Sequence, residues 1–276
     1  MIIDAHQHFW IYDPVRDSWI TDEMSLIRKD FLPEDLIKIY SSNKVEGCIA
    51  VQADQSASET LFLLELAMKH PFIKGVVGWI DHLSKNFPEE LQDYSKNTKL
   101  KGFRNIIQGQ PDEKYFTNRN FIEAFRNFQA NDFTYDILIY HNQLPAAIRF
   151  SERFPDQKFI LDHCAKPDIK WKSIKNWKKD IRILSGNPKM YCKLSGLVTE
   201  ADWKKWTYEE ISPYLEIAAE YFGTDRIIFG SDWPVCLLAG NYERVLDLIK
   251  RFTLQVTEKE RENIFSGNAI QFYQLN

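Results

Sequence analysis

Short apolar runs alternate along this chain with longer segments in which apolar residues recur at helical spacing. The runs are predicted strands: the one that ends at His6 and His8, and then residues 47–52, 73–80, 100–107, 133–140, 158–162, 190–194 and 226–230. The longer segments are predicted helices, at 33–43, 58–69, 88–96, 118–131, 145–154, 171–184 and 209–222, with two more at 242–252 and 257–265. An aromatic and charged loop over residues 9–30 follows the first strand.

Buried strands that alternate with helices pair in parallel through right-handed crossovers, and eight such units make a closed (β/α)₈ barrel. No linker or low-complexity tract divides the chain, so we predict one α/β domain over residues 1–276, a TIM barrel. An open doubly wound sheet is the alternative. It is disfavoured because no glycine-rich phosphate-binding loop follows the first strand.

Composition narrows the classes of function. Apolar residues make up 44% of the 276 positions, which is ample for a large core. The net charge is −4 and the basic residues form no stripe, so we do not expect the protein to bind nucleic acid. The four cysteines are scattered, as in proteins that keep their thiols reduced. With no signal peptide and no membrane-spanning run, we expect a cytoplasmic protein without a membrane partner.

In barrels of this kind the active site lies where the strands end, at their carboxyl side. Polar residues concentrate at the predicted strand ends: His6, His8, Arg104, Tyr140, His141, Asp162, His163, Lys193 and Asp232. Burying such groups is costly unless they bind a ligand, a metal or one another. We therefore predict a functional site at this rim of the barrel.

The first strand carries the clearest metal-binding pattern. His6 and His8 are two residues apart on a strand, so their side chains project on the same side and can share a metal ion. Alone, the pair is equally compatible with ordinary turn histidines. Together with His163 and Asp232 it would supply the imidazole and carboxylate ligands that zinc or manganese accepts.

Three further rim residues have alternative interpretations. Asp232 can accept a proton from an attacking water, or it can cap a helix, since Trp233 and Pro234 also suit a turn. Arg104 can bind a substrate carboxylate or polarise a carbonyl, or it can reach outward to the helices. Lys193 can point into the barrel toward an acid or extend to its exterior, and the sequence does not decide between the two.

The motifs together resemble the amidohydrolase-related (amidohydrolase-2) family of the amidohydrolase superfamily, and within it the sugar-lactone hydrolases of the L-fuconolactonase and L-rhamnonolactonase type. The matching stretches occur in order from residue 4 to about 240. They are residues 4–10, 30–33, 51–53 with Glu59 and Thr60, 75–79, 161–163 with Lys166 and Pro167, 193–197 with Glu200, and 229–234.

The resemblance implies a distorted barrel and hydrolysis of an ester within a ring. It also implies Asp232 as general base, His6, His8 and His163 around the reaction centre, and Arg104 on the substrate. Arg104 and Leu138 stand where the superfamily often has extra ligands, so one metal is expected rather than two. Some members of this branch work without a metal; Asp232 would then activate water unaided.

Our leading hypothesis is a hydrolase that opens a sugar-acid lactone such as L-fuconolactone. The small-molecule substrate would contact Trp10, Arg104, Tyr140 and His141, and one divalent metal, zinc or manganese, would be the cofactor. Two rivals are a metal-dependent decarboxylase of aromatic or muconic acids and a catalytically inactive barrel that binds a sugar acid. Whether the chain forms a homo-oligomer stays open.

Overall fold

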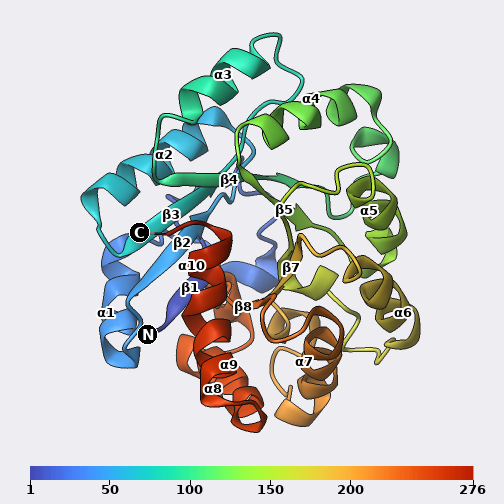
Figure 1. Cartoon of the computed structure of the whole chain (residues 1–276). Helices are drawn as coiled ribbons and strands as arrows, with labels where there is room; N and C mark the ends of the chain where they lie inside the picture. Colours follow the sequence, from blue (N-terminus) through green and yellow to red (C-terminus); the bar gives the residue numbers. More distant parts are fainter. Residues whose placement is uncertain (276) are drawn as a thin grey trace.

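Eight parallel strands form a barrel in the computed structural model, which describes residues 1–275. They are hydrogen-bonded in sequence order, and the helices lie outside them (Figure 1). The strands are β1 (Ile3–Gln7), β2 (Gly47–Val51), β3 (Ile73–Gly78), β4 (Leu100–Ile106), β5 (Thr134–Leu138), β6 (Phe159–Leu161), β7 (Met190–Leu194) and β8 (Ile227–Phe229). The predicted (β/α)₈ barrel is confirmed.

The helices agree with the predicted segments to within a few residues, apart from a later start of α6. They are α1 (Pro33–Asn43), α2 (Ala57–Lys69), α3 (Phe87–Tyr94), α4 (Arg119–Ala130), α5 (Leu144–Ser151), α6 (Lys175–Leu184), α7 (Tyr208–Phe222) and α8 (Tyr242–Phe252). Within the loop predicted at 9–30 a short 3₁₀ helix, Asp22–Ile27, forms. Over residues 1–275, no helix is both long enough and apolar enough to cross a membrane.

The C-terminal segment differs from the prediction. The expected helix at 257–265 is α9 (Glu258–Glu262) followed by a π-helical turn, Asn263–Gly267, and a further helix, α10 (Asn268–Phe272), was not predicted. Phe272 and Tyr273 pack with strand residues such as Ile49 and Ile160 in the barrel interior. The chain end therefore closes the barrel opposite the strand ends that carry the predicted site; α10 crosses the strands in Figure 1.

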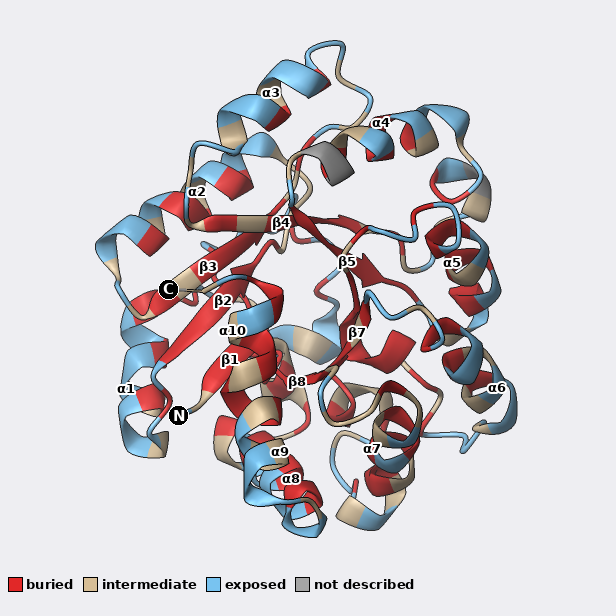
Figure 2. Ribbon diagram, in the orientation of Figure 1, coloured by how far each residue is buried: buried red, intermediate tan, exposed pale blue. Residues whose placement is uncertain are grey.

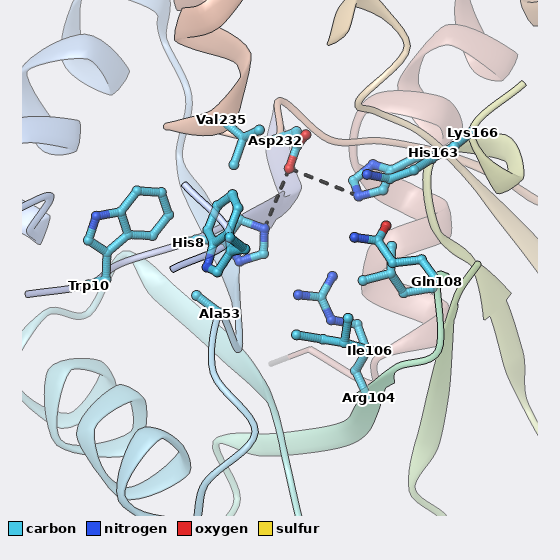
Figure 3. A pocket seen from close by; sticks show the side chains of 12 residues that line it. His8, Trp10, Ala53, Arg104, Ile106, Gln108, His163, Lys166, Asp232 and Val235 are labelled. Atoms are coloured by element: carbon cyan, nitrogen blue, oxygen red, sulfur yellow. Dashed lines mark ion pairs between the residues drawn. The ribbon is translucent and has the colours of Figure 1, made fainter. Parts of the chain in front are cut away.

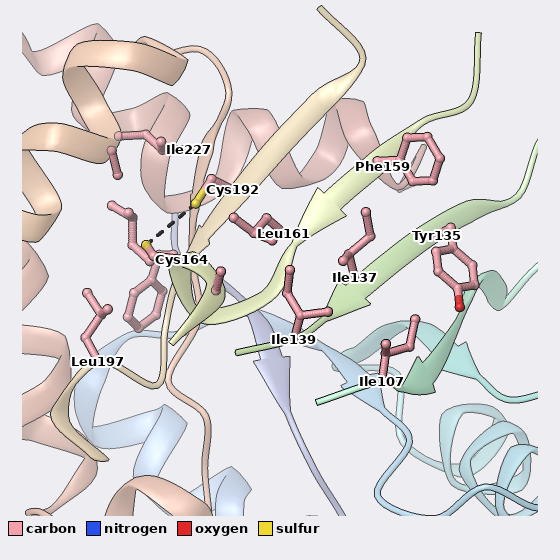
Figure 4. Close-up of a cluster of buried hydrophobic side chains, with 14 of the residues drawn as sticks. Ile107, Tyr135, Ile137, Ile139, Phe159, Leu161, Cys164, Cys192, Leu197 and Ile227 are labelled. Atoms are coloured by element: carbon pink, nitrogen blue, oxygen red, sulfur yellow. Dashed lines mark hydrogen bonds between the residues drawn. The ribbon is translucent and has the colours of Figure 1, made fainter. Parts of the chain in front are cut away.

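Alternation along the strands decides which side chains enter the barrel. Tyr135, Ile137, Leu161 and Cys192 pack into the core between strands and helices (Figure 4). The strands are buried on both sides, whereas the outer helices are exposed on one (Figure 2). Residues next to the outward ones must then face inward. Asp136 and Lys193 do so, as does Arg104, which follows the outward-facing Phe103; this settles the direction of Lys193.

The closure of the barrel between β1 and β8 brings the first and last motifs together. Just beyond β8, the Asp232 N–H donates to the His6 carbonyl at 2.8 Å, and the His8 N–H donates to the Trp233 carbonyl at 2.7 Å. The approach is close: a Cβ atom on Gly230 would lie 2.6 Å from the His6 Cβ. Only glycine fits there, and the seam holds both histidines beside Asp232.

Candidate active site

A cavity of about 170 Å³ opens at the C-terminal ends of the strands (Figure 3). It is lined by His8, Trp10, Trp19, Ala53, Arg104, Ile106, Gln108, Leu138, His163, Lys166, Asp232 and Val235. Five residues predicted from the sequence are therefore brought together here. His6 is fully buried just beneath them and contacts His8 and Asp232.

The histidines of β1 and the carboxylate of Asp232 form a compact cluster. His6 Nε2 lies 3.2 Å from His8 Nε2, and Asp232 Oδ1 lies 3.4 Å from His8 Nε2 and 3.8 Å from His6 Nε2. His8 Nδ1 lies 2.7 Å from the Val51 carbonyl, so Nδ1 carries the proton and donates it there. When the ring carries this one proton only, its Nε2 atom is an acceptor, and it faces a carboxylate. Two acceptors at this distance favour a cation, or a shared proton, between them.

His163 reaches the same carboxylate from the end of β6. Its Nε2 lies 4.0 Å from Asp232 Oδ1, and its Nδ1 lies 2.9 Å from Ser195 Oγ. Burial lowers the pKa of His163 to about 4, so the ring is neutral at physiological pH. Gly196 makes room for it, because a Cβ atom there would lie 2.4 Å from His163 Nδ1.

Two of these residues have unusual backbone dihedral angles. His163 has φ of 54° and Asp232 has φ of 60°, both in the left-handed region that residues other than glycine rarely adopt. The turn after β6 keeps positive φ through Lys166, and the Trp177 Nε1–H holds it by donating to the Cys164 carbonyl at 2.7 Å. Such conformations cost free energy and persist where surrounding packing enforces them, often at functional sites.

Below the cavity lies a set of buried, mutually paired charges, which we call the floor network: Arg104, Asp136, Asp162 and Lys193. Arg104 Nη1 lies 3.0 Å from Asp162 Oδ2, and Lys193 Nζ lies 2.9 Å from Asp162 Oδ1 and 2.5 Å from Asp136 Oδ2. Tyr273, from the C-terminal segment, donates its hydroxyl to Asp136 at 3.2 Å.

The floor network supports His6 from below. His6 Nδ1 lies 3.0 Å from Lys193 Nζ and 3.3 Å from Asp162 Oδ1, while Arg104 Nη1 lies 3.3 Å from His6 Nε2. Burial and the nearby Lys193 hold the pKa of His6 well below its usual range. Burial alone would raise the pKa of Asp162, but Lys193, His6 and Arg104 hold it well below its usual range. The imidazole is thus fixed in place, and Asp162 stays ionised.

The donor set fits a single divalent metal. Ligands bound at about 2.0–2.1 Å in a tetrahedral site are roughly 3.3–3.4 Å apart, close to the 3.2 and 3.4 Å that separate His8 from His6 and Asp232. The ligand atoms of His6, His8 and Asp232 all lie within 4.8 Å of one another. With a metal on Nε2, His6 would carry its proton on Nδ1 and donate it to Asp162 Oδ1 at 3.3 Å, as metal-bound histidines commonly do, in place of the 3.0 Å contact with Lys193 Nζ.

Tyr140 and His141, predicted as substrate contacts, lie at the rim rather than among the residues that line the cavity. Tyr140 is 39% exposed, and His141 Nδ1 lies 3.0 Å from the Lys166 carbonyl. Their contact with substrate stays a prediction. Gln108 and Lys166 line the cavity with amide and ammonium groups, and the sequence analysis gave neither a role. Lys166 stands within one of the stretches that resemble the sugar-lactone hydrolases, but a motif gives no side-chain direction.

Comparison with known proteins shows the family of this chain. Residues 3–275 match the family model described as amidohydrolase. The chain is 37% identical to an L-fucono-1,5-lactonase of Burkholderia multivorans and 32% identical to one of Burkholderia ambifaria, with 99% of this chain and 96% of each relative covered. A crystal structure of an amidohydrolase from Burkholderia multivorans with bound zinc has a TM-score of 0.96 and 37% identity, and the match covers 100% of both chains.

Proposed function

Since this chain belongs to the amidohydrolase family, we propose that it hydrolyses the ring ester of a sugar-acid lactone, with L-fucono-1,5-lactone as the first candidate substrate. The observation that carries the proposal is the carboxylate of Asp232, which faces the cavity between His8 and His163. The likeness to two L-fucono-1,5-lactonases over nearly the whole chain supports the choice of substrate.

Asp232 is the proposed general base. Burial acts to raise its pKa, but the neighbouring His163 and the contact with His8 hold the pKa well below the usual range. The carboxylate is therefore ionised at neutral pH and can take a proton from a water within hydrogen-bond reach. As the water oxygen bonds to the lactone carbonyl carbon, that proton moves to Asp232.

The remaining charge develops on the carbonyl oxygen. Arg104 and His163 line the cavity, and their N–H groups are the candidate donors to this oxyanion. A His163 whose Nδ1 accepts the Ser195 hydroxyl carries its proton on Nε2, toward the cavity. When the tetrahedral carbon collapses, the ring C–O bond breaks and Asp232 returns its proton to the leaving alkoxide. The product is the open hydroxy acid.

His6, His8 and Asp232 would hold one metal ion. His163 would be a further ligand only in the other tautomer, with its proton on Nδ1 and Nε2 free. A divalent ion such as zinc or manganese supplies a Lewis acid that polarises the carbonyl and lowers the pKa of a water. Zinc is the first candidate, because a zinc-containing crystal structure is among the similar ones.

The test is turnover of a panel of aldonolactones, followed with a pH indicator, on protein of known metal content. We expect L-fucono-1,5-lactone or a close stereoisomer to be opened with kcat/KM of at least about 10⁴ M⁻¹s⁻¹. No turnover of any lactone above the buffer rate would refute the proposed activity.

Metal content is tested on the same preparation. We expect about one equivalent of metal by elemental analysis, a loss of activity of at least about 10²-fold on chelation, and recovery on adding zinc. Full activity in metal-free protein would refute the metal assignment alone and leave the lactonase assignment intact.

A further inference from the structure

One wall of the cavity carries polar groups that the reaction above does not use. Gln108 follows β4 and Lys166 belongs to the left-handed turn after β6, and both line the cavity. In Figure 3 they lie on the opposite side of the cavity from Trp10, with the Gln108 amide pointing inward. A substrate ring held between the two walls would therefore have an indole on one side and these polar groups on the other.

The side-chain amide of Gln108 has an oxygen that no hydrogen-bond donor among the described residues reaches. Its Oε1 atom is enclosed, yet within residues 1–275 it accepts no hydrogen bond. A buried acceptor left unpaired costs about 1–3 kcal/mol, so the amide is suited to turn toward a donor that arrives with a ligand. A hydroxyl group can donate to it, whereas a ligand carboxylate cannot.

Lys166 is a donor whose charge is already matched. Its Nζ lies 3.6 Å from Glu200 Oε1, and the two side chains are 18% and 21% exposed. Arg104, another cation at the cavity, is matched in the same way by Asp162 at 3.0 Å. A substrate carboxylate would find neither cation free, while a hydroxyl can use the N–H donors without needing a net positive charge.

We infer that Gln108 and Lys166, with Glu200 as a positioning residue behind Lys166, form a subsite that binds ring hydroxyls of a neutral lactone and disfavours lactones bearing a carboxylate. This inference rests on the proposed function, whose substrate it narrows to polyhydroxylated, uncharged rings. Sites built to hydrogen-bond a substrate hydroxyl discriminate strongly against analogues that lack it, because their polar groups are then left unpaired.

The first experiment compares a hydroxylated 1,5-lactone with δ-valerolactone, which has the same ring and ester but no hydroxyls. We expect Gln108→Leu to lower kcat/KM for the hydroxylated lactone at least about tenfold and to change that for δ-valerolactone less than about threefold. The matched control is Gln110→Leu on the same loop, whose side chain bonds Lys114 instead and should alter neither value. Equal losses on both lactones would overturn the inference.

The second experiment changes the charge balance. Glu200→Gln leaves the Lys166 ammonium unmatched, so the ratio of kcat/KM for glucaro-1,4-lactone, which carries a carboxylate, to that for neutral galactono-1,4-lactone should rise about tenfold. The double variant Lys166→Met, Glu200→Gln should lose this gain. A purely structural role of Glu200 predicts equal losses for both lactones, and an unchanged ratio would overturn the assignment of Glu200 and Lys166.

A binding measurement separates a failure of the proposed subsite from a failure of the proposed lactonase activity. If the protein opens no lactone at all, including δ-valerolactone, the proposed function fails, and the subsite is then tested by calorimetry with L-fucose, a neutral polyhydroxylated ring. We expect the wild-type protein to bind L-fucose at least about tenfold more tightly than the Gln108→Leu variant. Equal affinity of the two proteins, or no binding by either, would overturn the inference.

Discussion

The floor network and the cluster of His6, His8 and Asp232 above it differ in how their buried polar groups are paired. In the floor network each cation contacts a carboxylate: Arg104 pairs with Asp162, and Lys193 lies between Asp162 and Asp136. In the cluster, by contrast, His8 Nε2 faces the Asp232 carboxylate at 3.4 Å, and this atom is an acceptor whenever the ring carries its proton on Nδ1 alone. Charges that are always buried must be paired, whereas acceptors that face one another beside a cavity are arranged for a ligand. We therefore propose that the floor network supports the cluster and that the cluster is the reactive part.

The largest expected effect comes from the cluster. Asp232→Asn keeps the shape of the side chain but cannot take a proton from water. We expect kcat to fall about 10⁴-fold, the upper end for a general base, because the same side chain would also bind the metal. Lactone turnover and elemental analysis measure the two roles separately.

The control for this variant is Asp225→Asn, an exposed carboxylate just before β8. It should retain full activity. In urea denaturation, the free energy of unfolding of both variants should lie within about 1 kcal/mol of the wild-type value. Turnover by Asp232→Asn within tenfold of the wild-type rate would contradict the proposed base.

The next effect comes from the floor network and acts on stability. Lys193→Met removes the cation between Asp136 and Asp162 and leaves two buried carboxylates without it. We expect the free energy of unfolding to fall by about 3–5 kcal/mol, measured by urea denaturation. Adding Asp136→Asn should recover part of this loss, because one buried charge is then gone.

Lys189→Met is the matched control, an exposed lysine just before β7. Its effect should be within about 0.5 kcal/mol. If Lys193→Met were as mild as this control, the floor network would not be the structural support that its geometry indicates.

The sequence predicted the reactive cluster better than the floor network. His6, His8, His163 and Asp232 stand at strand ends, and in a parallel barrel all strand ends meet at one rim, so their proximity follows from topology alone. Lys193 lies inside a strand, where its direction depends on which face of β7 packs outward. Tyr273 directly follows α10, whose short helical pattern comes after a π-helical turn and is too brief to predict. The direction of Lys193 and the contact of Tyr273 with Asp136 could be found only from the three-dimensional structure.

The smallest effect concerns Glu59, a buried carboxylate that belongs to neither group. It is 5% exposed, and its Oε1 accepts the Ala53 N–H at 2.9 Å, which holds a residue of the cavity wall. Burial raises its pKa from 4.5 to about 7, against the opposing effects of the Ala53 N–H and Arg16. The folded state therefore binds this proton more tightly than the unfolded state does, and stability falls as the pH rises from about 4.5 to about 7.

Glu59→Gln, which keeps the acceptor but cannot ionise, should be more stable than wild type by about 2–3 kcal/mol at pH 8 and equal to it near pH 4.5. Urea denaturation across this range measures the difference, with Glu65→Gln, exposed on the same helix, as the pH-independent control. A Glu59→Gln variant less stable than wild type at pH 8 would mean that ionised Glu59 has a partner as effective as those of the floor network.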